Sequence, residues 1–347
     1  MSKSIKNCFY KKLTFESLLK SHDRAKKNKT NRYELLKFSV DIETNIVGIM
    51  NSLKNGSYRL GKYKVFTIYE PKERIIKCLP YRDRIVQQWY IYEFIKPYII
   101  PRIINTCCAC IDNRGTHYAV LMVDKYINIM KRKYGKYYVL KLDIKKYFYN
   151  IDKNILYKIM NLYKIMNSFV SDKKILWLTK IFIYDDEIDK GIPIGNYTSQ
   201  YFANIYLSIL DRYVKEVLKV KYYVRYMDDM VILLSTKEEC RIVMEKIKMF
   251  LNKELKLELN NKSRYYPSKM GVNFCGYRIY DGYRLIRNSS KRKIKKRIKK
   301  WKKDKNMGCL DRKKMMISFN SWSSHIRHAN SYHIYQKIYR EIENIMF

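Results

Sequence analysis

Two adjacent carboxylates, Asp228 and Asp229, interrupt the otherwise apolar and β-branched run YVRYMDDMVILL at residues 223–234. Neighbouring carboxylates repel each other, and an apolar setting makes their charge costly unless a cation compensates it. In one continuous strand the two side chains would point to opposite faces of a sheet. The run therefore predicts a hairpin whose turn lets both carboxylates point outward from the end of a buried sheet.

A third carboxylate, Asp143, lies in the equally apolar strand pattern VLKLDI. Three oxygen ligands on two strands suit a hard divalent ion such as Mg²⁺, with water and substrate phosphates as further ligands. Two such ions about 3.5–4 Å apart can activate a 3′-hydroxyl and stabilise a leaving pyrophosphate. A surface turn with two solvated aspartates is the alternative, and the apolar flanks and the second acidic strand argue against it.

The charge balance predicts a polyanionic partner. Lys and Arg total 72 against 32 Asp and Glu, a net charge of +40 that is spread along the chain. Distributed cations neutralise phosphates, so nucleic acid is the expected partner. AT-rich codon bias is the alternative source of the many Lys, Asn, Ile and Tyr residues, but it does not explain the excess over acids. Many of the 34 tyrosines stand beside Lys or Arg, where they can stack on bases. We expect most of them to be half-buried sheet residues.

The cysteines and the apolar stretches bear on cell compartment. The eight cysteines form no pair of CxxC elements, and the five histidines complete no zinc pattern. CCAC at residues 107–110 indicates small buried residues in a strand. No apolar stretch approaches the roughly 18 residues that span a bilayer, and the N-terminus lacks the apolar core of a signal peptide. We therefore expect reduced thiols in a cytoplasmic protein that does not use a membrane.

Helical and strand patterns are interspersed rather than strictly alternating, which favours the α+β class. The apolar periodicity and the turn residues predict the elements as follows. Helices are expected over residues 1–45, 41–61, 81–100, 116–135, 153–184, 197–218, 238–256 and most of the last 60 residues. Strands are expected within residues 62–80, 137–143 and 222–234, with a short pair around Asp281-Gly282 in 273–285.

Several sequence blocks, in chain order, resemble those of one protein family. YMDD between two apolar strands resembles the catalytic hairpin of reverse transcriptases, and LDIKKYFYNID resembles their first catalytic-acid motif. The similarity continues in chain order, over roughly residues 60–280, through ERIIKCLPYRDRIVQQ, NRGTHYAV, GIPIGNYTSQYFANIYLSILD, LKLELNNKS and NFCGYRI. The resemblance implies a right-hand polymerase. Its parts would be an N-terminal helical extension (1–45), fingers and an RRM-like palm (46–284), and a basic helical thumb (285–347).

The block GIPIGNYTSQ, residues 191–200, indicates the kind of reverse transcriptase. Group II intron and retroviral enzymes usually carry Gln before this glycine and Ser-Pro further on. Here Ile194 precedes Gly195, and Ser199-Gln200 replaces Ser-Pro. This form resembles the enzymes of diversity-generating retroelements, which copy a template RNA with errors at adenines so that the cDNA replaces a variable gene segment. Ile194 offers shape but no polar contact, so relaxed discrimination is expected; packing under the fingers is the alternative.

Two other classes stay open. The sequence shows no Val-Thr-Gly element of retron enzymes and no HNH cluster, but a group II intron-like or phage-defence reverse transcriptase is an alternative. A catalytically silent RNA-binding scaffold is the alternative from another class. Intact acids at all three positions disfavour the scaffold.

The resemblance also implies site residues, which fall into three sets. The metal and catalytic set would hold two Mg²⁺ ions, for which Mn²⁺ can substitute, and supply a proton to pyrophosphate: Asp143, Asp228, Asp229, the Ile144 carbonyl and Lys262. The nucleotide-binding set is Lys72, Arg74, Arg114, Ile144, Phe148, Ile194, Gly195 and Gln200. The primer and template set is Tyr226, Met227, Phe274, Gly276, Tyr277, Lys295 and Lys299.

Several of these roles have a simpler alternative. Phe148 stands where the family places its sugar gate, and a core aromatic is the alternative. For each cation the alternative is a solvated surface charge. In the segment 289–303, Ile294, Ile298 and Trp301 form one apolar stripe of a helix whose other sides are basic, which suits a thumb helix on a duplex. The implied partners are template RNA, an RNA/DNA hybrid, dNTPs and a small basic pentameric accessory protein.

Overall fold

The computed structural model describes residues 8–28, 33–69, 72–165, 172–185 and 190–346. The chain divides into two compact units, and each is discontinuous in sequence. The helical unit comprises Met1–Asn105, Ile144–Lys219 and Lys246–Asn260. The sheet unit comprises Thr106–Asp143, Val220–Glu245 and Asn261–Phe347.

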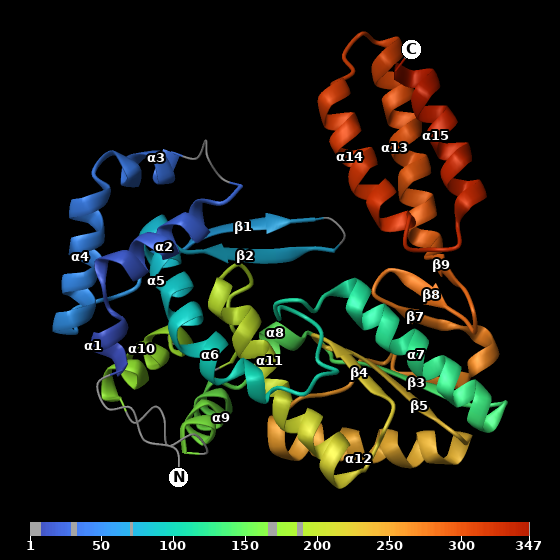
Figure 1. Cartoon of the computed structure of the whole chain (residues 1–347), viewed down its shortest axis with the longest axis horizontal. Coiled ribbons are helices and arrows are strands. Elements are labelled where there is room, and N and C mark those ends of the chain that lie inside the picture. The colour runs from blue at the N-terminus through green and yellow to red at the C-terminus, as the bar shows by residue number, and fades with distance from the viewer. Residues whose placement is uncertain (1–7, 29–32, 70–71, 166–171, 186–189, 347) are drawn as a thin grey trace. The chain divides into compact units, whose positions relative to one another are not determined.

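The sheet unit is built on an antiparallel sheet of four strands in the order β4-β5-β3-β6 (Figure 1). The strands are β3 (Tyr138–Asp143), β4 (Tyr223–Tyr226), β5 (Asp229–Leu234) and β6 (Arg264–Pro267). Helix α7 (Thr116–Tyr134) packs on β4 and β5. The shared core contains Val120, Val123 and Ile127 of the helix with Val139, Val224 and Val231 of the strands. The hairpin predicted at residues 222–234 is thus confirmed.

A second sheet of three antiparallel strands lies in the same unit. It consists of β7 (Val272–Phe274), β8 (Tyr277–Ile279) and β9 (Arg284–Ile286), and η4 (Ser268–Met270) precedes it. The sequence predicted only the pair around Asp281-Gly282. The structure adds a tighter hairpin at Cys275-Gly276, where both residues have positive φ, +45° and +93°. Two-residue hairpins favour such angles, but a cysteine in first position hides the signal.

Three helices follow: α13 (Asn288–Asn306), α14 (Arg312–Ile326) and α15 (Tyr332–Met346). The predicted stripe of Ile294, Ile298 and Trp301 is buried, and it belongs to the same core as Ile338 and Ile342 of α15. The apolar spacing alone therefore identified the packed face of α13.

The helical unit contains one antiparallel hairpin, β1 (Lys64–Ile68) with β2 (Arg74–Cys78). Its first helices are α1 (Cys8–Lys12), α2 (Phe15–Lys26), α3 (Tyr33–Val40), α4 (Ile42–Asn55), α5 (Tyr81–Tyr90), η1 (Ile91–Ile95), α6 (Lys96–Tyr98) and η2 (Ile100–Arg102). The others are α8 (Tyr147–Asn150), α9 (Lys153–Ile165), α10 (Lys173–Ile183), α11 (Tyr197–Arg212) and η3 (Tyr213–Val217). Helix α12 (Lys237–Leu255) starts in the sheet unit and ends in this one. The helix predicted over 153–184 appears as α9 and α10, and residues 166–171 between them lie outside the described residues.

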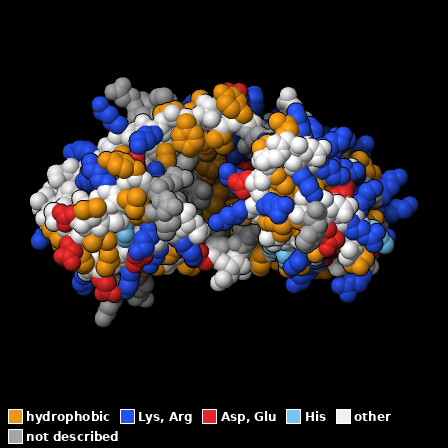
Figure 2. Space-filling view, turned by 90° about the horizontal axis from the view of Figure 1, so that it is seen from above, with side chains coloured by type: hydrophobic (Ala, Val, Ile, Leu, Met, Phe, Trp, Pro, Cys, Tyr) orange, Lys and Arg blue, Asp and Glu red, His pale blue; other side chains and the backbone are white. Residues whose placement is uncertain are grey.

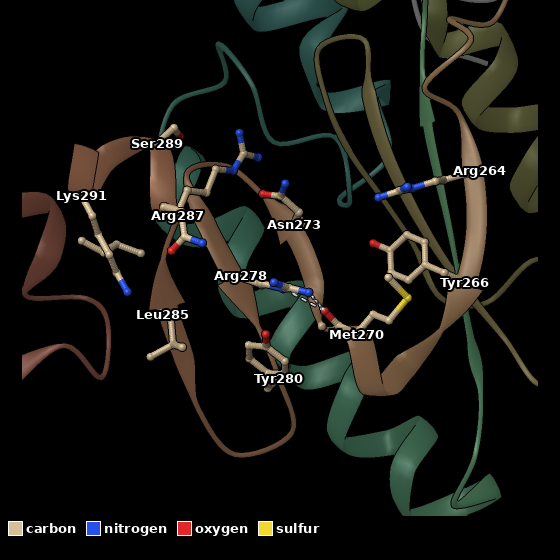
Figure 3. Close-up of a pocket in the computed structure, with 13 residues that line it drawn as sticks. Arg264, Tyr266, Met270, Asn273, Arg278, Tyr280, Leu285, Arg287, Ser289 and Lys291 are labelled. Carbon is tan, nitrogen blue, oxygen red and sulfur yellow. Dashed lines mark hydrogen bonds between the residues drawn. The ribbon is translucent and has the colours of Figure 1, made fainter. Parts of the chain in front are cut away.

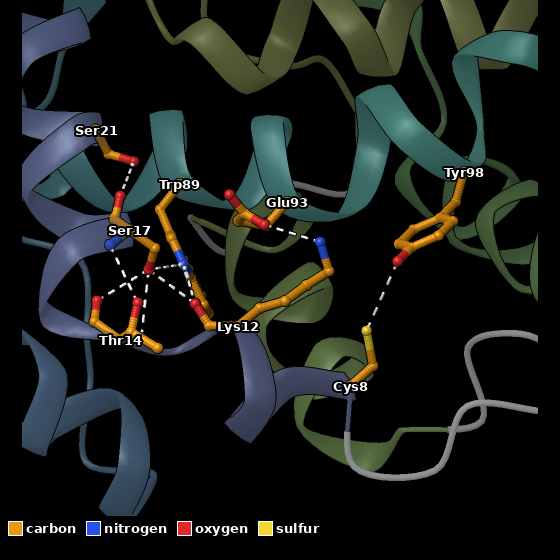
Figure 4. A network of polar contacts seen from close by, with 8 residues as sticks. All are labelled: Cys8, Lys12, Thr14, Ser17, Ser21, Trp89, Glu93 and Tyr98. Atoms are coloured by element: carbon orange, nitrogen blue, oxygen red, sulfur yellow. Dashed lines mark hydrogen bonds and ion pairs between the residues drawn. The ribbon is translucent and has the colours of Figure 1, made fainter.

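Polar contacts tie the N-terminal helices to the rest of the helical unit (Figure 4). The Thr14 hydroxyl caps α2 by accepting from the Ser17 N–H at 3.1 Å. The Trp89 indole N–H of α5 donates to the Lys12 carbonyl and to the Ser17 hydroxyl, both at 3.1 Å. The Lys12 ammonium pairs with Glu93 at 2.8 Å, and each of the two side chains is about one quarter exposed to water. These contacts fix α1 and α2 against α5 and η1.

All eight cysteines are free thiols. Lys and Arg side chains are spread over the face shown in Figure 2. None of the helices that the structure describes has the length and apolar character to cross a bilayer.

Candidate active site at the end of the four-stranded sheet

The strand register brings the predicted acids together. In the β3–β5 pair, Asp143 lies directly opposite Asp229, at the ends of both strands. Residues opposed in this way have Cβ atoms about 4.5–5.5 Å apart. Asp228 precedes Asp229 in the turn from β4, where Met227 adopts a left-handed φ of +54°. The left-handed conformation of Met227 makes a tight turn possible, and this turn places Asp228 and Asp229 at the end of the sheet.

Lys141, which the sequence reasoning missed, supplies the cation that the acids need. It lies two residues before Asp143 on the same face of β3, and its ammonium forms an ion pair with Asp229. Burial, assisted by the positive charge of Arg287, lowers the pKa of Lys141 to about 7. The charges of Asp143 and Asp228 oppose this shift, so all three carboxylates interact with one ammonium group.

The donor set fits a hard divalent ion. Asp143 and Asp229 line one cavity of about 580 Å³, together with Lys141 and Lys262. As the side chains stand, the described residues hold no cluster of three His, Cys, Asp or Glu side chains at metal-ligand spacing. At Asp229, the Lys141 ammonium lies against the carboxylate and compensates its charge. An ion that binds there must displace this ammonium.

A buried arginine holds the turn. Arg225 of β4 is fully buried, and its guanidinium donates to the Met227 carbonyl at 3.0 Å. Its backbone N–H donates to Thr106, and its carbonyl accepts from Cys108, both at 2.9 Å. The segment 107–110 therefore lies along β4. The predicted strand there was wrong in extent: Cys107 makes only an isolated bridge, because the chain turns at once.

The other side of the site is fixed by Ser263, which the sequence reasoning also missed. Its hydroxyl accepts from the Asp143 N–H and donates to the Asp143 carbonyl, both at 3.1 Å. Ile144 follows directly and bridges to Leu259. Ser263 adjoins Lys262, so the predicted proton donor is in the lining of the cavity that contains Asp143.

The residues predicted to grip the primer divide into two groups. Lys295 and Lys299 are exposed on α13, and Tyr226 and Met227 are partly exposed at the turn. Phe274 and Tyr277, in contrast, are fully buried, so a primer does not reach their rings as the side chains stand. Both rings belong to the core of the sheet unit: the Lys141 ammonium lies 4.9 Å from the centre of the Phe274 ring, and the Tyr277 ring packs against His325 of α14.

Gly276 shows why this hairpin is compact. A Cβ atom there would lie 2.8 Å from the His325 ring, and Gly276 has φ of +93°. The Tyr277 hydroxyl donates to the His325 carbonyl at 2.8 Å. The β7–β8 hairpin is therefore fastened to α14 by contacts that leave no room for a side chain.

The predicted nucleotide-binding residues lie in the helical unit, except for Arg114. Lys72, Arg74 and Gln200 are exposed, and Phe148 and Ile194 are partly buried. Arg114 donates to the Cys107 carbonyl at 3.1 Å, so it supports the loop beside β4.

The loop that contains Ile194 is held against β2. The Ile194 carbonyl accepts from the Lys77 N–H at 3.0 Å. Gly195 has φ of +133°, and a Cβ atom there would lie 2.4 Å from the Lys77 carbonyl oxygen. The absence of a side chain at Gly195 therefore allows close approach to the Lys77 backbone.

A buried polar network supports the same loop. Asn196 donates to the Tyr63 hydroxyl at 2.7 Å, and Tyr63 donates to Asp185 at 2.6 Å. Asp185 pairs with Lys153 at 2.9 Å, and both side chains are almost fully buried. The Tyr197 N–H donates to the Gln87 side chain at 3.0 Å. These partners are remote in sequence, so no local pattern indicated them.

The family model described as reverse transcriptase (RNA-dependent DNA polymerase) matches residues 62–279, well over half of the chain. The group II intron-encoded protein LtrA of Lactococcus lactis subsp. cremoris is 24% identical over an alignment of 310 residues, which covers 68% of this chain and 50% of that protein. The chain spans about half the length of the curated relatives it matches.

Solved structures of telomerase are also similar. The apo telomerase from Candida tropicalis, truncated from the C-terminal domain, has a TM-score of 0.49 and 15% identity, covering 70% of this chain and 60% of that chain. The telomerase from Candida albicans has a TM-score of 0.45 and 13% identity, covering 68% and 46%. On the strength of the match over residues 62–279, the chain belongs to the reverse transcriptase family, and its mixture of helices and antiparallel sheets is of the α+β class.

Proposed function

We propose that the chain is an RNA-directed DNA polymerase of a diversity-generating retroelement, which makes error-prone cDNA by two-metal nucleotidyl transfer. The observation that supports polymerisation most directly is the register of Asp143 opposite Asp229, with Asp228 next in the turn. The family match over residues 62–279 supports the same activity.

In this proposal, Asp143, Asp228, Asp229 and the Ile144 carbonyl hold two Mg²⁺ ions, or Mn²⁺ in their place. When bound, the ions acidify a primer 3′-hydroxyl and neutralise the leaving pyrophosphate. The Lys141 ammonium releases Asp229 at that stage. Lys262 donates a proton to the pyrophosphate oxygen.

Nucleotide binding is assigned to eight residues of the fingers and palm. Lys72, Arg74 and Arg114 would bind triphosphate oxygens, since guanidinium groups match phosphate geometry. The Phe148 ring excludes a ribose 2′-hydroxyl and so selects dNTPs. Ile194, Gly195 and Gln200 contact the nascent pair and the template.

The proposed nucleic-acid path uses template RNA and the RNA/DNA hybrid as substrates. We assign residues 1–45 to an N-terminal extension, 46–284 to fingers and palm, and 285–347 to a thumb. Lys295 and Lys299 of the thumb face the duplex, and Tyr226, Met227 and Gly276 lie at the primer end, where Phe274 and Tyr277 support them from the core. A small basic pentameric accessory protein would be the protein partner of this polymerase. Both would work in the cytoplasm.

A group II intron-like reverse transcriptase is the second candidate, because LtrA aligns over 310 residues at 24% identity. The block at 191–200 separates the two. Group II intron enzymes usually carry Gln before the glycine, whereas this chain has Ile194. Finding a near-duplicate DNA segment that differs only at adenines beside the gene would favour the retroelement.

Primer extension with purified protein tests the activity. Wild type should extend a primer on RNA, and Asp228→Ala should lose extension by several orders of magnitude. Asp281→Ala, in an exposed turn of the same unit, is the charge-matched control and should keep activity. If wild type extends no primer under any template, salt or metal condition, the RNA-binding scaffold is the better explanation.

Fidelity is tested separately by sequencing the cDNA. We expect misincorporation to concentrate at template adenines and to fall in Ile194→Gln, because a polar group can restore an orienting hydrogen bond worth about 1–3 kcal/mol. Ile194→Leu preserves the apolar character and serves as control. Unchanged adenine errors in Ile194→Gln would remove Ile194 from the explanation.

A further inference from the structure

A second cavity of the sheet unit, of about 500 Å³, lies between β6, the three-stranded sheet and the start of α13 (Figure 3). Four of its lining residues are cations, and we call it the basic pocket: Arg264, Arg278, Arg287 and Lys291. Among the described residues that line it there is no carboxylate. Its size falls within the range of pockets for small ligands.

The cations are costly to hold together without an anion. The Arg287 Nε atom is buried and has no hydrogen-bond partner among the described residues. Burial lowers the pKa of Arg287. A buried N–H donor without an acceptor loses hydration that nothing replaces. An anion in the pocket would supply the missing acceptor.

The start of α13 adds to this requirement. The helix has 19 residues, no acidic residue in its first turn and no side-chain cap at Arg287. Free N–H groups and the helix dipole favour negative charge at this end, yet the chain places Arg287 and Lys291 there. The same end is therefore arranged to receive an anion from outside.

The remaining cations are positioned in advance. The Arg278 guanidinium donates twice to the Met270 carbonyl, at 2.8 and 2.6 Å, which fixes its orientation. The Arg264 guanidinium lies 5.6 Å from the Tyr266 ring centre. Figure 3 shows Arg264 and Arg287 entering from opposite sides, with Asn273 between them. Preorganised cations bind an oxyanion with less loss of conformational freedom.

The basic pocket adjoins the cavity of the catalytic acids, because both are lined by Arg264, Tyr266, Asn273 and Arg287. We infer that the basic pocket is a binding site for a phosphate oxyanion. The planar guanidinium groups match phosphate oxygens. The identity of the phosphate rests on the proposed polymerase function: it belongs either to released pyrophosphate or to a nucleic-acid backbone.

Calorimetric titration with pyrophosphate tests the site itself. The full chain carrying Asp228→Ala is used in EDTA, so that no metal bridges the ligand to the acids. Pyrophosphate should bind, and Arg287→Gln or Arg278→Gln should weaken it at least tenfold. Arg292→Gln is the control, because Arg292 is exposed on α13 and outside the pocket lining. Melting curves verify folding, and if Arg287→Gln fails to fold, Arg278→Gln and Lys291→Gln decide.

A second measurement distinguishes the two phosphate sources. Affinity for a primer–template duplex is measured against salt concentration, with Arg241→Gln on α12 as control. If a backbone phosphate occupies the pocket, Arg287→Gln should lower the magnitude of the slope of log affinity against log salt concentration by about 0.9. Loss of pyrophosphate binding with an unchanged slope assigns free pyrophosphate. If the pocket variants behave like wild type in both measurements, the inference is overturned. That outcome is independent of whether the wild type extends a primer.

Discussion

At the scale of single residues, the site depends on polar groups buried beside the acids. Arg225 is fully buried within β4, and its guanidinium holds the carbonyl of Met227 at the turn before the acid pair. Lys141 compensates Asp229 from the neighbouring strand. Buried charges of this kind persist when each has a partner, so their removal has consequences beyond the loss of one contact.

We expect Arg225→Met to lower the free energy of unfolding by about 1–3 kcal/mol, because the Met227 carbonyl loses its donor. Primer extension should fall with it, since the turn that presents Asp228 loosens. Chemical denaturation measures the first effect. Arg241→Met, exposed on α12, should change stability by less than about 0.5 kcal/mol; equal effects at the two positions would contradict the role of Arg225.

Cysteine reactivity gives a second prediction at this scale. Burial raises the pKa of the Cys240 and Cys275 thiols to about 12, whereas Cys309 is exposed. Only the thiolate reacts, so iodoacetamide at pH 8 should label Cys309 at least tenfold faster, as peptide mass spectrometry can follow. Equal labelling of the three thiols would contradict the burial.

The same shifts make the free energy of unfolding fall as the pH rises above about 8.5, because the thiols ionise in the unfolded chain and stay protonated in the folded one.

At the scale of elements, the loop before α11 is fastened to β2 by backbone contact. Ile194 accepts from Lys77, and Gly195 leaves no space for a Cβ atom. The network of Tyr63 and Asp185 supports it from behind. A loop held at both backbone and side chain gives Ile194 a defined position, which a role in base-pair discrimination requires.

Gly195→Ala should therefore be disruptive. Its Cβ atom would collide with the Lys77 carbonyl, and its φ of +133° disfavours any side chain. We expect a fall in melting temperature of several degrees, seen by calorimetry, and reduced extension. Gly48→Ala is the matched control: nothing lies within 4 Å of its Cβ position in α4, so it should be neutral or stabilise by up to about 1 kcal/mol. The opposite order would refute this account of the loop.

At the scale of the whole molecule, the net charge of +40 should govern nucleic-acid affinity. We expect the double variant Lys295→Gln, Lys299→Gln to lower the salt slope of duplex binding by up to about 1.8, because each lost phosphate contact removes about 0.9. Fluorescence anisotropy over a salt series measures it. Lys20→Gln, on a residue paired with Glu16, is the control; an identical slope in the double variant would exclude α13 from the duplex interface.

Much of this architecture was predictable from local pattern. The apolar run around Asp228 predicted the hairpin, and the spacing of Ile294 and Ile298 predicted the buried face of α13. The roles of Lys141 and Arg225 were not predictable. A cation in a strand usually indicates a solvent-exposed side chain, and the group that it contacts becomes known only from the strand register. Ser263 was missed for the same reason: its partner, Asp143, is 120 residues away in sequence.

The chain passes from one compact unit to the other five times, and one passage falls directly after Asp143. No single cut can therefore release a half that keeps all of its own strands and helices. A fragment that stopped before residue 261 would lack β6 and the Ser263 hydroxyl that clasps Asp143. Dissecting this protein into pieces for expression is consequently a poor strategy, whereas an insertion at the exposed Asp281-Gly282 turn would spare every passage.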